Sequence, residues 1–162
     1  MALVIFEGIV CCFIVLLSCV YGIANGAENM VFFYDEKVQK RCIENRLITE
    51  KKIKRNKSLF MYLGVLPYFV FVIVAVFFIN KARGFWQGFY QMSAVLLIEG
   101  VFDRIFIDWY WVNHTRAWLI PGTEDLRPYI DKQAFIKKWA GTVIGFPIIP
   151  AIISAILSFI LK

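Results

Sequence analysis

The stretch Leu59–Ile79, LFMYLGVLPYFVFVIVAVFFI, decides the fold class because it contains no charged side chain. A helix needs about 20 consecutive apolar residues to cross the hydrocarbon core of a bilayer. Residues 2–24 and 139–161 also reach this length, and residues 85–107 form a fourth stretch that charged side chains interrupt. We therefore predict an all-α polytopic membrane protein, with four transmembrane helices in a small bundle and residues 1–162 as a single membrane domain.

The composition supports this prediction. The chain is 60% hydrophobic, whereas soluble domains are roughly 45–50% apolar. The first stretch begins MALVIFEGIV, without Lys or Arg; secretory signals begin with a basic segment, so we expect a retained helix. Three of the four cysteines, Cys11, Cys12 and Cys19, fall in this first span, and Cys42 falls in a loop. Their spacing matches neither a zinc site nor a disulfide framework.

The basic residues are distributed unevenly among the predicted connections. Residues 25–58 and 108–138 are rich in them, whereas the short turn before residue 85 holds only Lys81 and Arg83. The basic residues of the two large loops are Lys37, Lys40, Arg41, Arg46, Lys51, Lys52, Lys54, Arg55, Lys57, Arg116, Arg127, Lys132, Lys137 and Lys138. Because cytoplasmic loops are enriched in Lys and Arg, we predict that both loops are cytoplasmic. Both termini, with Lys162, are then on the extracytoplasmic side of the cell membrane, and the net charge of +6 reflects topology and not nucleic-acid binding.

Both large loops contain signs of amphipathic helical segments. In Met30–Arg46, the apolar residues Val31, Tyr34, Val38 and Cys42 fall at helical spacing, which predicts an interfacial helix or an extension of the first span. Thr49, Thr123 and Asp131 are typical N-cap residues placed before helical stretches. The basic residues Lys51, Lys52, Lys54, Arg55 and Lys57 suit anionic lipid headgroups, although we favour ordinary positive-inside anchoring as their explanation.

Ionisable residues enter the third predicted span near its cytoplasmic end. Glu99 and Asp103 lie about 40° apart on one helical face, and Arg104 and Asp108 are four residues apart and able to pair. Charged groups at membrane depth usually pair with each other or face a cavity. We therefore expect either a ligand-binding site or an interhelical salt-bridge network here. At the other end of the bundle, we expect Glu7 to hydrogen bond with Gln87 or Gln91, which lie at similar depth.

The segment that follows extends this candidate site. His114, Arg116 and Arg127 accompany two turn signals and a helix start. This pattern fits an anion site at the membrane surface, and it fits equally a folded re-entrant cap in which the arginines pair internally with Glu124 and Asp125. Trp109, Tyr110, Trp111 and Trp118 are expected to lie at the membrane interface, as such residues often do, or to stack on a ligand. His114 is the only histidine, so it either titrates in a site or simply makes a local hydrogen bond.

The sequence leaves the function open among three classes. The first is a transporter-like or ligand-binding protein whose site contains Glu99, Asp103, Arg104, Asp108, His114, Arg116 and Arg127. The second is a membrane enzyme acting on a lipid-like substrate at the cytoplasmic interface, with Asp108 or His114 as the base. The third is a non-catalytic accessory subunit of a membrane complex. Small bundles favour a homo-oligomer or a complex. No P-loop, dinucleotide fingerprint or metal-ligand spacing appears, so we expect neither cofactor nor metal.

Overall fold

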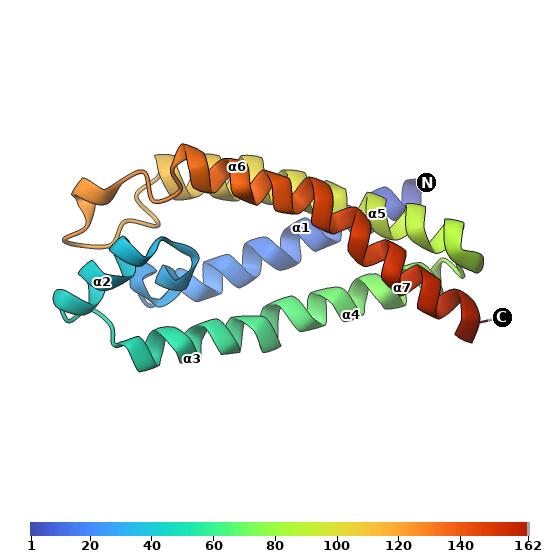
Figure 1. Ribbon diagram of the computed structural model, residues 1–162, viewed down its shortest axis with the longest axis horizontal. Helices are drawn as coiled ribbons and strands as arrows, with labels where there is room; N and C mark the ends of the chain where they lie inside the picture. The colour runs from blue at the N-terminus through green and yellow to red at the C-terminus, as the bar shows by residue number, and fades with distance from the viewer. Residues whose placement is uncertain (162) are drawn as a thin grey trace.

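Long helical segments run side by side along the molecule in the computed structural model, which describes residues 1–161 (Figure 1). The segments are α1 (Ala2–Ile23); α3 (Glu50–Phe60), η2 (Met61–Val65), α4 (Leu66–Val74) and η3 (Ala75–Ile79); α5 (Gly84–Phe102) and η4 (Asp103–Val112); and α6 (Lys132–Ala140), η6 (Gly141–Gly145) and α7 (Phe146–Ile160). No strand occurs within residues 1–161. The all-α prediction is confirmed.

Three of these helical segments are long and apolar enough to cross a membrane: Ala2–Ile23, Glu50–Ile79 and Lys132–Ile160. The chain is therefore a helical protein suited to a membrane, with lipid as the solvent of its outer surface. The fourth predicted span falls in α5, which is helical but less apolar, because it includes Gln87, Gln91 and Glu99.

The lower apolarity of α5 has a structural reason. This helix packs chiefly against α1 on one side and α7 on the other. The backbones approach closely at two glycines: a Cβ on Gly8 would lie 2.9 Å from Ile98, and one on Gly100 would lie 2.7 Å from Thr142. A helix enclosed by its neighbours does not need the continuous apolar surface that lipid contact requires.

The two large loops fold together into a cap at one end of the bundle, which we term the loop end. Val31, Tyr34, Val38 and Cys42 are all buried, as their helical spacing indicates. The predicted single helix over Met30–Arg46 is wrong, however. The chain forms η1 (Ala27–Phe33) and α2 (Glu36–Glu44), separated at Tyr34, whose backbone is extended.

Trp118 is buried inside this cap. Its side chain is 1% exposed and packs at 5.3 Å between ring centroids against Trp111. It shares one core with Val31, Ile120 and Tyr129. By contrast, Trp109 and Tyr110 are about half exposed, at 52% and 50%, as expected of residues at an interface.

The predicted N-caps are confirmed at two of three positions. The Thr49 side chain accepts a hydrogen bond from the Lys52 amide at 3.3 Å, and Asp131 accepts one from the Ala134 amide at 2.7 Å. Thr123 precedes η5 (Glu124–Leu126) but does not cap it through its side chain. Its hydroxyl is buried and donates to the Ile120 carbonyl at 2.8 Å, because tertiary packing draws it inward.

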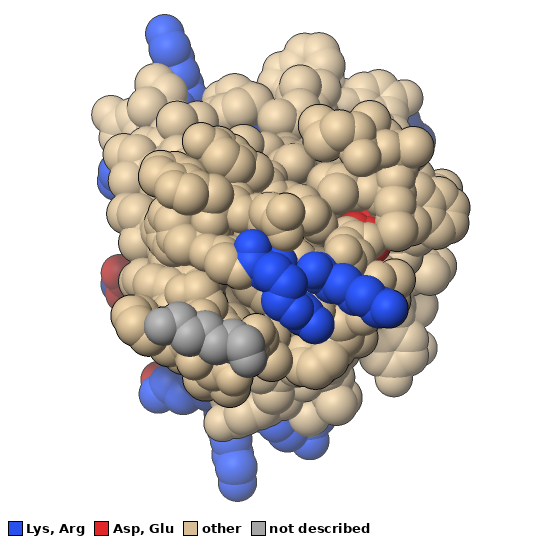
Figure 2. Space-filling model, turned by 90° about the vertical axis from the view of Figure 1, so that its right-hand side faces the viewer, with Lys and Arg blue, Asp and Glu red and all other residues tan. Residues whose placement is uncertain are grey.

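Both ends of the chain lie at the end of the bundle opposite the cap, which we term the terminal end (Figure 1). Seen face on, this end is mostly covered by side chains that are neither acidic nor basic, with a small basic group across its middle (Figure 2). The connection that carries Lys81 and Arg83 joins η3 to α5. Lys162 lies outside the described residues.

Candidate functional site

A cavity of about 260 Å³ lies within the bundle toward the loop end. Its wall includes residues from α1, from the helix that begins with α3, from α5 and η4, and from α6 and α7. The cap closes it with Phe33, Tyr34, Trp118 and Ile130. Ligand pockets measure roughly 300–1,000 Å³, so the volume of this cavity lies just below that range and limits it to a small ligand.

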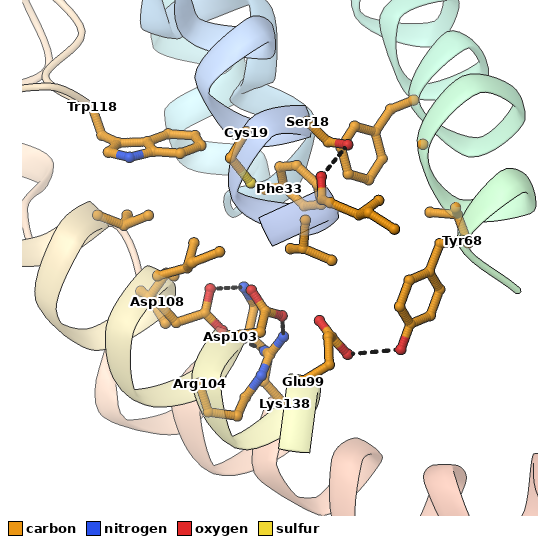
Figure 3. A pocket seen from close by; sticks show the side chains of 18 of the residues that line it. Ser18, Cys19, Phe33, Tyr68, Glu99, Asp103, Arg104, Asp108, Trp118 and Lys138 are labelled. Carbon is orange, nitrogen blue, oxygen red and sulfur yellow. Dashed lines mark hydrogen bonds and ion pairs between the residues drawn. The ribbon is translucent and has the colours of Figure 1, made fainter. Parts of the chain in front are cut away.

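One wall of the cavity carries a chain of alternating charges. Arg104 forms ion pairs with Asp103 and with Asp108, and the Lys138 ammonium lies 2.8 Å from the other oxygen of Asp108. Figure 3 shows these side chains together at one side of the cavity. The two acids and two bases cancel formally, which a group of charges removed from water requires.

Glu99 stands apart from this chain. Its carboxylate is 5% exposed and accepts a hydrogen bond of 3.1 Å from the Tyr68 hydroxyl across the cavity (Figure 3). It forms no ion pair with a basic side chain in residues 1–161. A buried carboxylate without a cationic partner is unfavourable unless it takes up a proton or meets a cation.

The backbone explains how Asp103 and Asp108 reach the same guanidinium. The η4 segment is a π-helix, in which hydrogen bonds join residues five apart. Residues five apart on an α-helix point roughly 140° away from each other, whereas on a π-helix they return to nearly the same face. Three further π-helical segments, η2, η3 and η6, occur in the neighbouring helices, and η2 contributes Gly64 and Val65 to the cavity wall.

The rest of the cavity lining is rich in aromatic rings. Phe33, Tyr34, Phe60, Tyr68, Phe69, Trp118 and Phe146 all line the cavity. Burial raises the pKa of the Tyr34 phenol, so this group remains a hydrogen-bond donor, and its oxygen has no hydrogen-bond partner within residues 1–161. The Lys138 ammonium lies 6.0 Å from the centre of the Phe33 ring, within the range of a cation–π contact.

The predicted site residues separate into two groups in the structure. Glu99, Asp103, Arg104 and Asp108 all line the cavity. His114 and Arg116 are exposed, and neither belongs to the cavity wall. The His114 Nδ1 atom lies 2.6 Å from the Trp109 carbonyl oxygen, which is the local hydrogen bond considered above.

Arg127 has a different position again. Its guanidinium donates to the backbone carbonyls of Val112, Asn113 and Thr115. These carbonyls lie at or just beyond the end of η4, where helices leave carbonyl groups without partners and where a cation is favourable. The contacts give Arg127 a structural role: it ties the loop to the end of this helix.

Two residues of the polar wall were missed from the sequence, Lys138 and Tyr68. Lys138 was predicted only to be a basic residue of the loop. It directly precedes the apolar stretch 139–161, just as Asp108 directly follows the stretch 85–107, so the two residues lie at similar depth. Tyr68 follows Pro67 in an otherwise uncharged helix and gave no signal at all. Both contacts join residues about thirty positions apart, so no local pattern could indicate them.

The buried acid at the other end was assigned the wrong partner. Glu7 is 4% exposed and accepts a hydrogen bond of 2.9 Å from the Asn80 side chain, and not from Gln87 or Gln91. Gln87 instead accepts from the Arg83 amide at 2.9 Å. Asn80 ends the second long helical segment, and the turn back into α5 places it beside the start of α1.

No cluster of three or more His, Cys, Asp or Glu side chains within residues 1–161 is arranged to hold a metal ion. Comparisons with protein-family models, with curated proteins and with solved structures find no match.

Proposed function

We propose that the chain is a four-span membrane protein with both termini on the extracytoplasmic side. Three apolar helical segments support part of this proposal. The position of both termini at one end of the bundle supports an even number of crossings (Figure 1). The basic residues of the cap support a cytoplasmic loop end. Alkaline phosphatase fused after Leu161 in bacteria should be active, and fused at Cys42 inactive; the reverse pattern would invert the orientation.

In this topology, the protein binds a small amphipathic molecule that carries an ammonium group. The observation that carries this proposal is the Glu99 carboxylate, which faces an aromatic-lined cavity without a cationic partner. A carboxylate provides the counter-charge for a ligand cation, and aromatic faces attract quaternary ammonium groups. The remaining wall, with residues such as Ile14, Val15 and Ile107, suits a short apolar chain.

The charge chain beside Glu99 contributes selectivity in this proposal. Asp103 and Asp108 are already neutralised by Arg104 and Lys138, so they add little attraction for a second cation. Glu99 is then the one carboxylate of this wall whose charge the ligand would balance. An anionic ligand of equal shape would instead bring a second negative charge to Glu99, which is strongly unfavourable at low dielectric.

The test compares ligands that differ in charge but share an alkyl chain. Isothermal titration of the purified protein with hexyltrimethylammonium should give saturable binding of one equivalent. Hexanesulfonate and hexanol should bind at least about tenfold more weakly, a difference of about 1.4 kcal/mol. Equal affinities for all three would mean that only partition into an apolar space is measured, and the proposed function would fail.

A further inference from the structure

Besides the cavity, a groove of about 450 Å³ lies at the outside of the bundle, between the end of α1, η1 and α3. One half of its lining is polar and basic, with Asn25, Lys52 and Arg55. The other half is apolar, with Tyr21, Leu59 and Leu63. The groove therefore passes from the charged part of the second long helical segment to its apolar part, which is where the headgroup region of a bilayer meets the acyl chains.

The two basic side chains of the groove have no counter-charge. Lys52 and Arg55 are exposed, three residues apart on one face of α3. Neither forms an ion pair within residues 1–161, whereas the neighbouring Lys54 is paired with Glu50 at 2.6 Å. The groove thus presents a local positive charge beside an apolar surface.

The polar floor of the groove is fixed by hydrogen bonds between asparagines. The Asn56 side chain donates to the Asn29 carbonyl at 3.0 Å, which ties α3 to η1. The Asn29 side chain in turn donates to the carbonyls of Asn25 and Gly26, both at 3.0 Å. These bonds hold the two walls at a set separation, so that the groove is a formed feature and not a gap between loose segments.

The apolar half is open to the surroundings. Tyr21, Leu59 and Leu63 are 83%, 48% and 73% exposed, and they belong to helical segments suited to a membrane. Large apolar side chains next to unpaired basic groups match an amphipathic molecule with a negative charge, whereas the ligand proposed for the cavity has a positive charge. They do not match a free inorganic anion, which would leave the apolar half uncovered.

We propose that this groove binds one anionic phospholipid. Its phosphate pairs with Lys52 and Arg55, and one acyl chain lies along Leu59 and Leu63. The groove adjoins the cavity beside Glu99, with which it shares Ser18, Phe60 and Gly64, but Lys52 and Arg55 line the groove only. The proposal does not depend on the function proposed for the cavity. It also differs from general attraction of the basic loop to anionic lipids, because only two of the basic residues of α3 line it.

The test compares the basic residues of α3 that line the groove with those that do not. Delipidated protein in a neutral detergent is titrated with short-chain phosphatidylglycerol, and bound lipid is counted by native mass spectrometry. Wild-type protein should retain one tightly bound lipid. The double variant Lys52→Gln/Arg55→Gln should bind at least about tenfold more weakly, since each basic residue near a headgroup contributes appreciably.

The matched control is Lys51→Gln/Lys57→Gln, which removes the same charge from the same helix at exposed positions outside the groove. This variant should bind phosphatidylglycerol within about twofold of wild type. Equal weakening in both double variants would overturn the proposal in favour of unspecific attraction. Phosphatidylcholine or glycerol phosphate binding as tightly as phosphatidylglycerol would overturn it too. Unchanged circular dichroism and melting temperature establish that both variants fold.

Discussion

Glu7 and Glu99 are the same chemical group, buried to nearly the same extent, in different parts of one bundle. Each accepts one hydrogen bond from a neutral side chain, Glu7 from Asn80 and Glu99 from Tyr68. Glu99 lines the cavity and adjoins the chain of charged residues, whereas Glu7 belongs to neither. The comparison teaches that a buried acid does not by itself indicate a site; the space beside it does.

The surroundings differ because the helices pack differently at the two levels. Near the terminal end, small residues let side chains fill the interior: a Cβ on Gly88 would lie 2.5 Å from Phe77 and 2.8 Å from Ser154. Toward the loop end, the π-helical segments η2 and η4 line the cavity. A π-helical segment also occurs at the terminal end, where η3 ends just before Asn80, so this backbone form does not by itself distinguish the two levels.

Removing Arg104 should give the largest effect on stability. Arg104→Ala leaves Asp103 and Asp108 without their shared partner in surroundings that are largely closed to water, and breaking such a pair costs about 3–5 kcal/mol. The melting temperature in detergent should fall markedly. Arg116→Ala, at an exposed position, is the control and should change stability by less than about 0.5 kcal/mol. If the two variants melt alike, the charge chain is solvated.

The sequence predicted the part of this charge chain that is local. Arg104 and Asp108 are four residues apart, so their pairing follows from helix geometry. Thr49 and Asp131 were recognised as caps for the same reason. The pairing of Asp103 with the same guanidinium also belongs to the salt-bridge network expected from the sequence, whereas no residue in the stretch signals its π-helical backbone. The Lys138 and Tyr68 contacts depend on tertiary packing, as does the inward turn of Thr123.

A smaller effect is expected from overpacking the terminal end. Gly88→Ala places a methyl group against buried Phe77, and overpacking of this kind costs about 1–3 kcal/mol. Gly141→Ala is the matched change, because nothing lies within 4 Å of the position its Cβ would take. Gly141→Ala should stabilise the protein by about 0.4–1 kcal/mol, because alanine lowers the conformational entropy of the unfolded chain. Opposite shifts in melting temperature are expected; a rise for both variants would mean that Gly88 is not tightly packed against Phe77.

The comparison of the two acids supplies the most direct test of the proposed function. Glu99→Gln and Glu7→Gln make the same change, which keeps size and hydrogen-bonding capacity but removes the charge. The measurement is the dissociation constant for hexyltrimethylammonium in each folded variant. Glu99→Gln should weaken binding at least about tenfold, and Glu7→Gln should stay within about twofold of wild type. Equal affinities in the two variants would contradict the assignment of Glu99 as the ligand's counter-charge.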